Sequence, residues 1–251
     1  MTYFRHLRAG TAVTALVTAL VASAATGVGE AEAGVLFLDP VGASGLMPNG
    51  AINDILKSIY GAGVTNRGGY YGSTIRLAGK TAVTFTFLGF EAGYDNEFLL
   101  DGDGNGSFDL IFSNKSGGGT DVNGKAKTAV GDTYTVELDP ANFTAGIIPF
   151  LLKADVNGAK GLLANGDAND GAVNFFTSYD GNPAAISGSS LVVFFDDGGA
   201  GVDSDYDDMA IRIAAAVPEP ETIAILGLGL LALGWMVIRR KEDVSSLNNK
   251  G

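Results

Sequence analysis

Two groups of acidic residues in this chain have the composition and spacing of candidate cation-binding sites. Over residues 101–109, carboxylate and amide oxygens alternate with glycine, a spacing that lets alternate side chains converge on one cation. The candidate ligands are Asp101, Asp103, Asn105 and Asp109. Gly106 stands where a calcium-binding loop bends sharply, but Phe112 occupies the place of its final bidentate glutamate. We therefore expect weak calcium binding, or alternatively a hairpin loop whose Asp and Asn side chains accept backbone hydrogen bonds.

The second acidic group precedes the last predicted strand. Six carboxylates fall within thirteen residues, namely Asp196, Asp197, Asp203, Asp205, Asp207 and Asp208. Such carboxylates repel one another, and a divalent cation would relieve that repulsion, which makes calcium the candidate ion here too. The apolar face of the strand that follows shares its alternation with three of these acids, so we expect the group in a loop at the sandwich edge. The alternative is a solvated acidic loop without an ion.

Other catalytic chemistry has few residues to use. The only histidine is His6 and there is no cysteine, so residues 34–216 cannot build a Ser-His-Asp or Cys-His arrangement, or a zinc site of the usual composition. A carboxylate pair acting on a glycosidic bond needs no histidine, but no pair stands out among the many Asp residues. We therefore expect that the protein is not an enzyme. The net charge of −12 repels phosphates, so we also expect no nucleic-acid partner.

The segments around these acidic groups are predicted to be short strands. Thirty-seven glycines, many in Asn-Gly and Asp-Gly pairs, mark turns, and nineteen Asp against three Glu in residues 34–216 favour loops over helix faces. Between the turns lie alternating or β-branched runs. The predicted strands are 81–88, 97–100, 108–112, 133–138, 147–152, 173–179, 191–195 and 209–213. Several short strands at this spacing predict an all-β fold, an antiparallel β-sandwich or jelly roll.

One segment competes with the strand pattern. Within residues 51–59, Ile52, Ile55, Leu56 and Ile59 fall on one helical face, which predicts a single short helix packed on the sheet. We expect residues 34–216 to form one β-sandwich domain. Five tyrosines fall in or beside the predicted loops and would suit sugar stacking, or alternatively a plain hydrophobic rim. They are Tyr60, Tyr70, Tyr71, Tyr94 and Tyr206.

The N-terminal residues have the pattern of a secretory signal peptide. Arg5 and Arg8 precede an apolar stretch over residues 9–25, and small-residue cleavage patterns follow. Cleavage after Ala33 defines a signal peptide over residues 1–33, and cleavage after Ala24 is the alternative. Signal peptidase and the secretion machinery are the expected partners.

The C-terminal residues combine three unlike parts. Residues 217–222 contain Pro218, Glu219 and Pro220, which hold the chain extended and accessible. An uncharged run at residues 223–238 would span roughly 24 Å as a helix, a little less than the roughly 30 Å hydrocarbon core. The tail 239–251 begins with Arg239, Arg240 and Lys241, and these charges favour the cytoplasmic side of an inner membrane, which places the sandwich in the periplasm.

This order of parts resembles the PEP-CTERM sorting signal of Gram-negative bacteria. The resemblance implies that an exosortase, an integral-membrane cysteine peptidase, processes the chain at Pro218-Glu219-Pro220 and that the product reaches the cell surface or the extracellular polymer matrix. A plain single-pass anchor is the alternative. Residues 87–96 and the second acidic group resemble, more loosely, segments of secreted PEP-CTERM proteins with β-sandwich domains.

Together these features predict an exported structural protein of the surface or matrix, associated with exopolysaccharide or biofilm. The alternative is a calcium-dependent carbohydrate-binding module or adhesin.

Overall fold

The computed structural model describes residues 35–47, 54–114, 127–154, 161–167, 169, 173–198, 205–217 and 228–235. Its strands are β1 (Leu36–Leu38), β2 (Ala43–Met47), β3 (Arg67–Tyr71), β4 (Ile75–Leu77), β5 (Thr81–Gly89), β6 (Glu97–Leu100), β7 (Asp109–Ser113), β8 (Thr133–Leu138), β9 (Phe150–Ala154), β10 (Gly161–Ala164), β11 (Asn174–Tyr179), β12 (Ser187–Gly188), β13 (Ser190–Asp196) and β14 (Met209–Ala215). The helical elements are α2 (Asp54–Tyr60), two 3-10 turns, η1 (Pro140–Asn142) and η2 (Thr144–Gly146), and a helical segment at 228–235.

The described strands form three sheets in which every pairing is antiparallel. The largest has the order β2-β3-β11-β13-β14-β5-β8, a four-stranded sheet has the order β10-β9-β6-β7, and a small sheet has the order β12-β1-β4. The predicted all-β class with one short helix is confirmed for the described residues.

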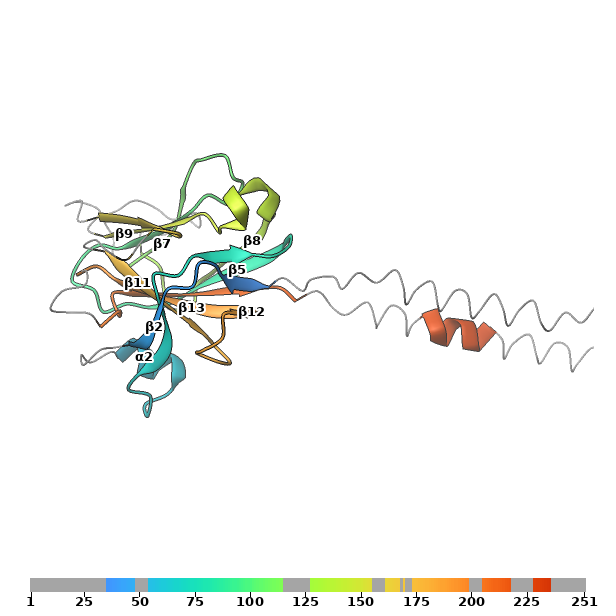
Figure 1. Cartoon of the computed structure of the whole chain (residues 1–251), viewed down its shortest axis with the longest axis horizontal. Coiled ribbons are helices and arrows are strands. Elements are labelled where there is room, and N and C mark those ends of the chain that lie inside the picture. Colours follow the sequence, from blue (N-terminus) through green and yellow to red (C-terminus); the bar gives the residue numbers. More distant parts are fainter. Residues whose placement is uncertain are drawn as a thin grey trace, which may run out of the picture. The chain divides into compact units, whose positions relative to one another are not determined.

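The main core lies between the seven-stranded and four-stranded sheets. Alternation along β5 directs Val83, Phe85 and Phe87 inward, where all three are fully buried. Phe85 meets Phe98 of the facing sheet at 5.5 Å between ring centroids, and Phe150 meets Phe175 at 6.3 Å. In Figure 1 the four-stranded sheet lies above the seven-stranded sheet, and α2 lies below it. The packed inner faces of two sheets define a β-sandwich.

A second, smaller core covers part of the other face of the large sheet. Ile55 and Leu56 of α2 pack with Phe176, Val192 and Phe194 of the sheet. These side chains alternate along their strands with residues of the main core, so the middle of the large sheet is buried on both faces. This second core explains why α2 forms, because a helix of seven residues depends on the packing of its apolar face.

Close strand contacts depend on glycine at one position. A Cβ at Gly69 of β3 would lie 2.2 Å from the Thr177 carbonyl oxygen and 2.6 Å from the Phe176 ring. Only glycine lets β3 approach β11 this closely.

Most predicted strands are present, with shifts at two places that matter for the site. Strand β8 has the predicted bounds, and β5, β6, β11, β13 and β14 agree with prediction to within two residues. The strand predicted over 147–152 begins at Phe150, after the two 3-10 turns, and the strand predicted from Phe108 begins one residue later. Phe108 therefore belongs to the preceding loop.

Six described strands had no counterpart among the predictions. They are β1, β2, β3, β4, β10 and β12, and each has five residues or fewer. The glycine-containing sequences of β2, β3 and β12 give no alternation signal, because glycine has no side chain to place on either face.

The terminal predictions fall largely outside the described residues. The signal peptide at 1–33, the residues Pro218, Glu219 and Pro220, and the basic residues Arg239, Arg240 and Lys241 all lie there. Within the predicted membrane span, residues 228–235 are helical, and Leu228, Leu230, Leu231, Leu233 and Trp235 are exposed. Over the described ranges, no helix has both the length and the apolar character needed to cross a membrane.

Candidate functional site

The first acidic group forms the loop between β6 and β7. The Asp101 carboxylate is nearly buried and accepts hydrogen bonds from the backbone N–H of Asn105 at 3.1 Å and of Gly106 at 2.9 Å. Asp103 accepts from the Asn105 side chain at 2.7 Å, and the Asn105 oxygen accepts from the Ser107 N–H at 2.7 Å. The oxygens of Asp101, Asp103 and Asn105 therefore cap the loop's own donors, as in the hairpin alternative. Asp109 begins β7, where it is exposed.

The second acidic group is more buried than predicted. Asp196 ends β13, Asp197 follows it, and Asp207 and Asp208 precede β14. The residues Asp196, Asp197 and Asp207 are nearly inaccessible to solvent. These three side chains are therefore not solvated, although Asp196 and Asp208 accept hydrogen bonds from the backbone N–H groups of Gly198 and Asp197, as expected for turns that Asp side chains cap. The strand alternation did not show this, because Asp197 and Asp207 have contacts with Asn96 and Glu91, which are distant in the sequence. Asp205 is half-buried, and Asp203 lies outside the described residues.

Two residues that the site prediction did not include belong to this group. The backbone N–H of Glu91 donates to the Asp207 carbonyl at 2.8 Å, and the Asn96 amide donates to Asp197 Oδ2 at 2.7 Å. Asn96 is fully buried, and its own Oδ1 atom accepts no hydrogen bond from the described residues. The sequence did contain a signal for these two residues. Both lie in the segment 87–96, which, like the second acidic group, resembles segments of secreted proteins with β-sandwich domains.

Two carboxyl groups of this acidic group, those of Asp207 and Asp208, have raised pKa values. Burial raises the pKa of Asp207 to about 9, helped by the charge of Asp205 and by a side-chain hydrogen bond with Glu91. Burial also raises the pKa of Asp208 to about 8, assisted by the charges of Asp197, Asp196 and Asp205, although a hydrogen bond from the Asp197 N–H at 2.6 Å acts in the opposite direction. At neutral pH these two carboxyls are protonated unless a cation compensates their charge.

Calcium binding at either group stays a prediction. Within the described ranges, no set of three or more acidic or histidine side chains has an arrangement that could hold a metal ion. The second group contains the stronger set of oxygen donors, because buried carboxylates and the Asn96 carbonyl oxygen are the ligand types that calcium prefers.

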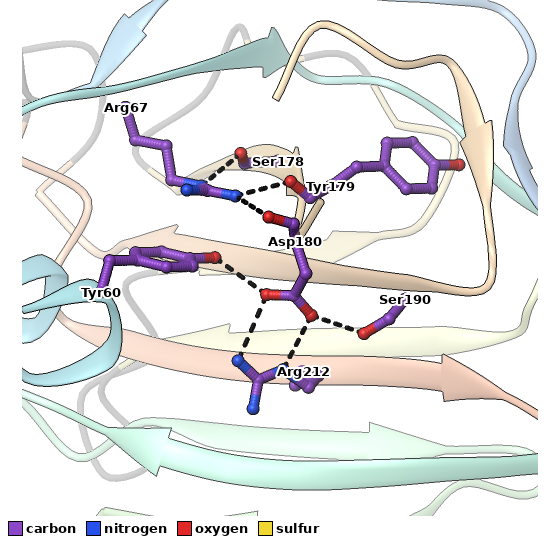
Figure 2. Close-up of polar contacts among 7 residues, drawn as sticks. All are labelled: Tyr60, Arg67, Ser178, Tyr179, Asp180, Ser190 and Arg212. Carbon is purple, nitrogen blue, oxygen red and sulfur yellow. Dashed lines mark hydrogen bonds and ion pairs between the residues drawn. The ribbon is translucent and has the colours of Figure 1, made fainter. Parts of the chain in front are cut away.

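A polar network on the outer face of the large sheet ties α2 to three strands (Figure 2). Asp180, directly after β11, accepts hydrogen bonds from Arg212 of β14, from the Ser190 hydroxyl of β13 and from the Tyr60 hydroxyl at 3.2 Å. Arg67 of β3 donates to the carbonyl oxygens of Tyr179 and Asp180, and its guanidinium lies 3.6 Å from the centroid of the Tyr60 ring.

Four of the five tyrosines considered for sugar stacking have other contacts. Tyr60 is covered by Arg67, the Tyr70 hydroxyl donates to the Ala184 carbonyl, and Tyr71 and Tyr206 pack together in the second core at 5.5 Å. Tyr94 has the most exposed side chain of the set, at 39%. The tyrosines thus support the fold more than an open sugar-binding surface.

Comparison with known proteins identifies the tail. Residues 216–241 match the family model of the PEP-CTERM protein-sorting motif. Neither the curated proteins nor the solved structures give a match to the chain. The motif covers Pro218, Glu219, Pro220 and the basic residues after the apolar run.

A β-sandwich followed by this motif defines an exported protein that carries its sorting signal at the C-terminal side. By that match the chain carries a PEP-CTERM protein-sorting motif over residues 216–241. The motif implies an exosortase as processing partner, a membrane-anchored stage and a final location on the cell surface.

Proposed function

We propose that the β-sandwich is a structural component of the cell surface or extracellular polymer matrix, released or transferred there after an exosortase acts at Pro218-Glu219-Pro220. The match of residues 216–241 to the sorting motif is the observation that carries this proposal. A signal peptide over residues 1–33 begins export, and the charges of Arg239, Arg240 and Lys241 keep the tail cytoplasmic, so the sandwich faces the periplasm before processing.

The sandwich itself is proposed to be non-enzymatic. Residues 34–216 contain neither histidine nor cysteine, the usual general bases and nucleophiles. The ionisable groups with the most strongly perturbed pKa values among the carboxylates, Asp207 and Asp208, are engaged in holding the β5–β6 and β13–β14 segments together. Perturbed carboxyls of this kind also occur in structural clusters.

Cell fractionation tests the matrix role. In the native host, the sandwich should be recovered with the extracellular polymer, and deletion of the exosortase gene should shift it to the inner-membrane fraction. Replacement of Pro218, Glu219 and Pro220 by alanine should cause the same shift without altering the amount of protein. Recovery in the matrix at wild-type levels after either change would contradict the proposal.

A second candidate function, a calcium-dependent carbohydrate-binding module or adhesin, is favoured by the second acidic group. Asp196, Asp197 and Asp207 are buried, and Asp197 accepts a hydrogen bond from the Asn96 amide. Bound calcium would offset the cost of removing these charges from water and would rigidify the loops at that end of the sandwich.

A further inference from the structure

Two hollows lie on either side of the β6–β7 loop. One, of about 360 Å³, is lined by the rings of Phe108 and Phe143 together with polar groups that include Asp101 and Asn142. The other, of about 400 Å³, is lined by Tyr134 and by a set of polar residues. Asn142, at the end of η1, lines both hollows. The volumes lie in the range of roughly 300 to 1,000 Å³ that small-molecule sites occupy.

The walls of these hollows are held in place by local hydrogen bonds. Asp101 fixes the β6–β7 loop through the backbone N–H groups of Asn105 and Gly106, and Asp139 caps η1 by accepting from the Ala141 N–H at 3.0 Å. The loop also packs directly on η1. A Cβ at Gly104, whose φ is +73°, would lie 2.9 Å from the Asn142 carbonyl oxygen. The two hollows are therefore preformed, which lowers the entropic cost of binding a ligand.

The two hollows offer complementary chemistry. Phe108 is 38% exposed although it is a large aromatic residue, and it stands at the rim of the smaller hollow beside the half-buried Phe143. The larger hollow presents acceptor oxygens from Asp103, Asp109 and Asp139. A pyranose ring has apolar C–H faces that pack on aromatic rings, and its hydroxyl groups donate to carboxylate and amide oxygens. An aromatic hollow next to a carboxylate-lined one suits consecutive sugar units.

Charge decides which sugars fit. The larger hollow contains the carboxylates of Asp103, Asp109, Glu137 and Asp139 against one cation, Lys80, whose ammonium already pairs with Glu137 at 2.8 Å. This surplus of negative charge repels uronates, sulfated sugars and phosphates. We propose that the paired hollows around the β6–β7 loop bind a segment of a neutral polysaccharide, with Phe108 as stacking platform and Asn142 as the polar contact shared by both subsites.

This inference goes beyond the proposed structural role, and it can fail or succeed independently of it. Sugar binding is a property of the purified protein, whereas sorting is measured in cells. The proposed sugar contact is also a new one. Four of the five tyrosines considered from the sequence have other contacts, and Phe108 was predicted to lie inside a strand.

Titration with defined sugars tests the proposal. The full chain in detergent is titrated calorimetrically with cellohexaose, laminarihexaose, maltohexaose, xylohexaose and chitohexaose, with hexagalacturonate as the anionic probe. At least one neutral sugar should bind with a Kd below about 1 mM. Phe108→Ala should weaken that binding by about tenfold, and Asn142→Ala should weaken it by several-fold.

The matched control is Tyr94→Ala, which removes a ring of similar exposure that lines neither hollow and should leave binding unchanged. Unfolding midpoints equal to wild type show that each variant is folded, and Asp109→Asn provides a second variant of the same hollows. The proposal is overturned if no neutral sugar binds, if hexagalacturonate binds more tightly than every neutral sugar, or if Phe108→Ala and Tyr94→Ala bind alike.

Discussion

Arg212 of β14 and Asp180 after β11 form a two-pronged ion pair across the intervening strand β13. Arg212 Nε lies 2.9 Å from Asp180 Oδ2, and Nη2 lies 3.2 Å from Oδ1. Because the Ser190 hydroxyl of β13 donates to the same carboxylate, one side chain joins three adjacent strands. Tyr60 adds α2 to the same network (Figure 2).

Removing the Asp180 charge should destabilise the sandwich moderately. Asp180→Asn loses the charge-assisted bonds to Arg212. Because the two side chains are 26% and 32% exposed and solvent partly screens the pair, we expect a loss of about 1–2 kcal/mol in the free energy of unfolding, measured in urea. Glu137→Gln, which breaks the exposed pair with Lys80, should leave the unfolding midpoint unchanged and serves as the control. Equal effects of the two changes would contradict a special role for Asp180.

The Asp180 carboxylate should also make the folded state less stable at acidic pH. Burial acts to raise the pKa of Asp180, but hydrogen bonds from Arg212 and Ser190 outweigh it and hold the pKa below its usual value. A lowered pKa in the folded state gives stability that is present above about pH 4 and is lost as the pH falls. Wild type and Asp180→Asn should therefore converge in stability near pH 2, and a constant difference from pH 7 to pH 2 would refute this.

The second acidic group should have the opposite pH dependence. The pKa values of Asp207 and Asp208 are raised in the folded state, so their contribution is fully present below about pH 4 and is lost as the pH rises toward 8 or 9. Without a divalent cation, the melting temperature should fall between pH 5 and pH 9. Asp207→Asn, which cannot ionise, should flatten that fall, and a pH profile identical to wild type would be the contrary result.

Calcium should act mainly on that group. Millimolar calcium should raise the melting temperature, and more strongly at pH 9 than at pH 6, because ionised carboxylates bind the cation. Asp197→Asn should abolish the shift if the second group binds the ion, whereas Asp103→Asn should abolish it if the β6–β7 loop does. The absence of any shift in wild type would exclude calcium at both groups under these conditions.

Truncation of an aromatic side chain at the centre of the main core should strongly destabilise the sandwich. Phe98 is fully buried and lies 5.5 Å from Phe85, 6.0 Å from Phe112 and 5.3 Å from Phe150 between ring centroids. Phe98→Ala should cost about 3–5 kcal/mol of unfolding free energy because it leaves a cavity between the sheets. Phe108→Ala, at an exposed ring, should change stability by less than about 0.5 kcal/mol. Comparable losses would show that Phe108 is packed as a core residue.

The sandwich was predictable from sequence where one face of a strand is buried and the other is not. The alternation of Phe85 and Phe87 with Thr84 and Thr86 reports such a strand directly, and β5 has that pattern. It was not predictable where glycine removes the alternation, as in β3, whose Gly69 is required by a contact with the distant β11. Local patterns contain no information about such contacts.

In the candidate sites too, local features were predictable from the sequence and features that depend on distant contacts were not. The spacing of Asp101, Asp103 and Asn105 correctly indicated a tight oxygen-lined loop, because the relevant bonds are local. The burial of Asp196 and the contact between Asn96 and Asp197 depend on residues about a hundred positions apart, and so they emerged only from the fold. The exposed position of Phe108 was likewise concealed by a strand boundary that differed from prediction by one residue.

Mass spectrometry of the surface-exposed protein tests the sorting claim most directly, because it reads both mature termini. We predict an N-terminus near Gly34 and a C-terminus at or near Pro218-Glu219-Pro220, so that peptides containing Trp235, Arg239 and Arg240 are absent from the surface fraction and present in an exosortase-deletion strain. A surface-exposed product that still contains Trp235 and both arginines would contradict processing and would identify a simple tethered envelope protein.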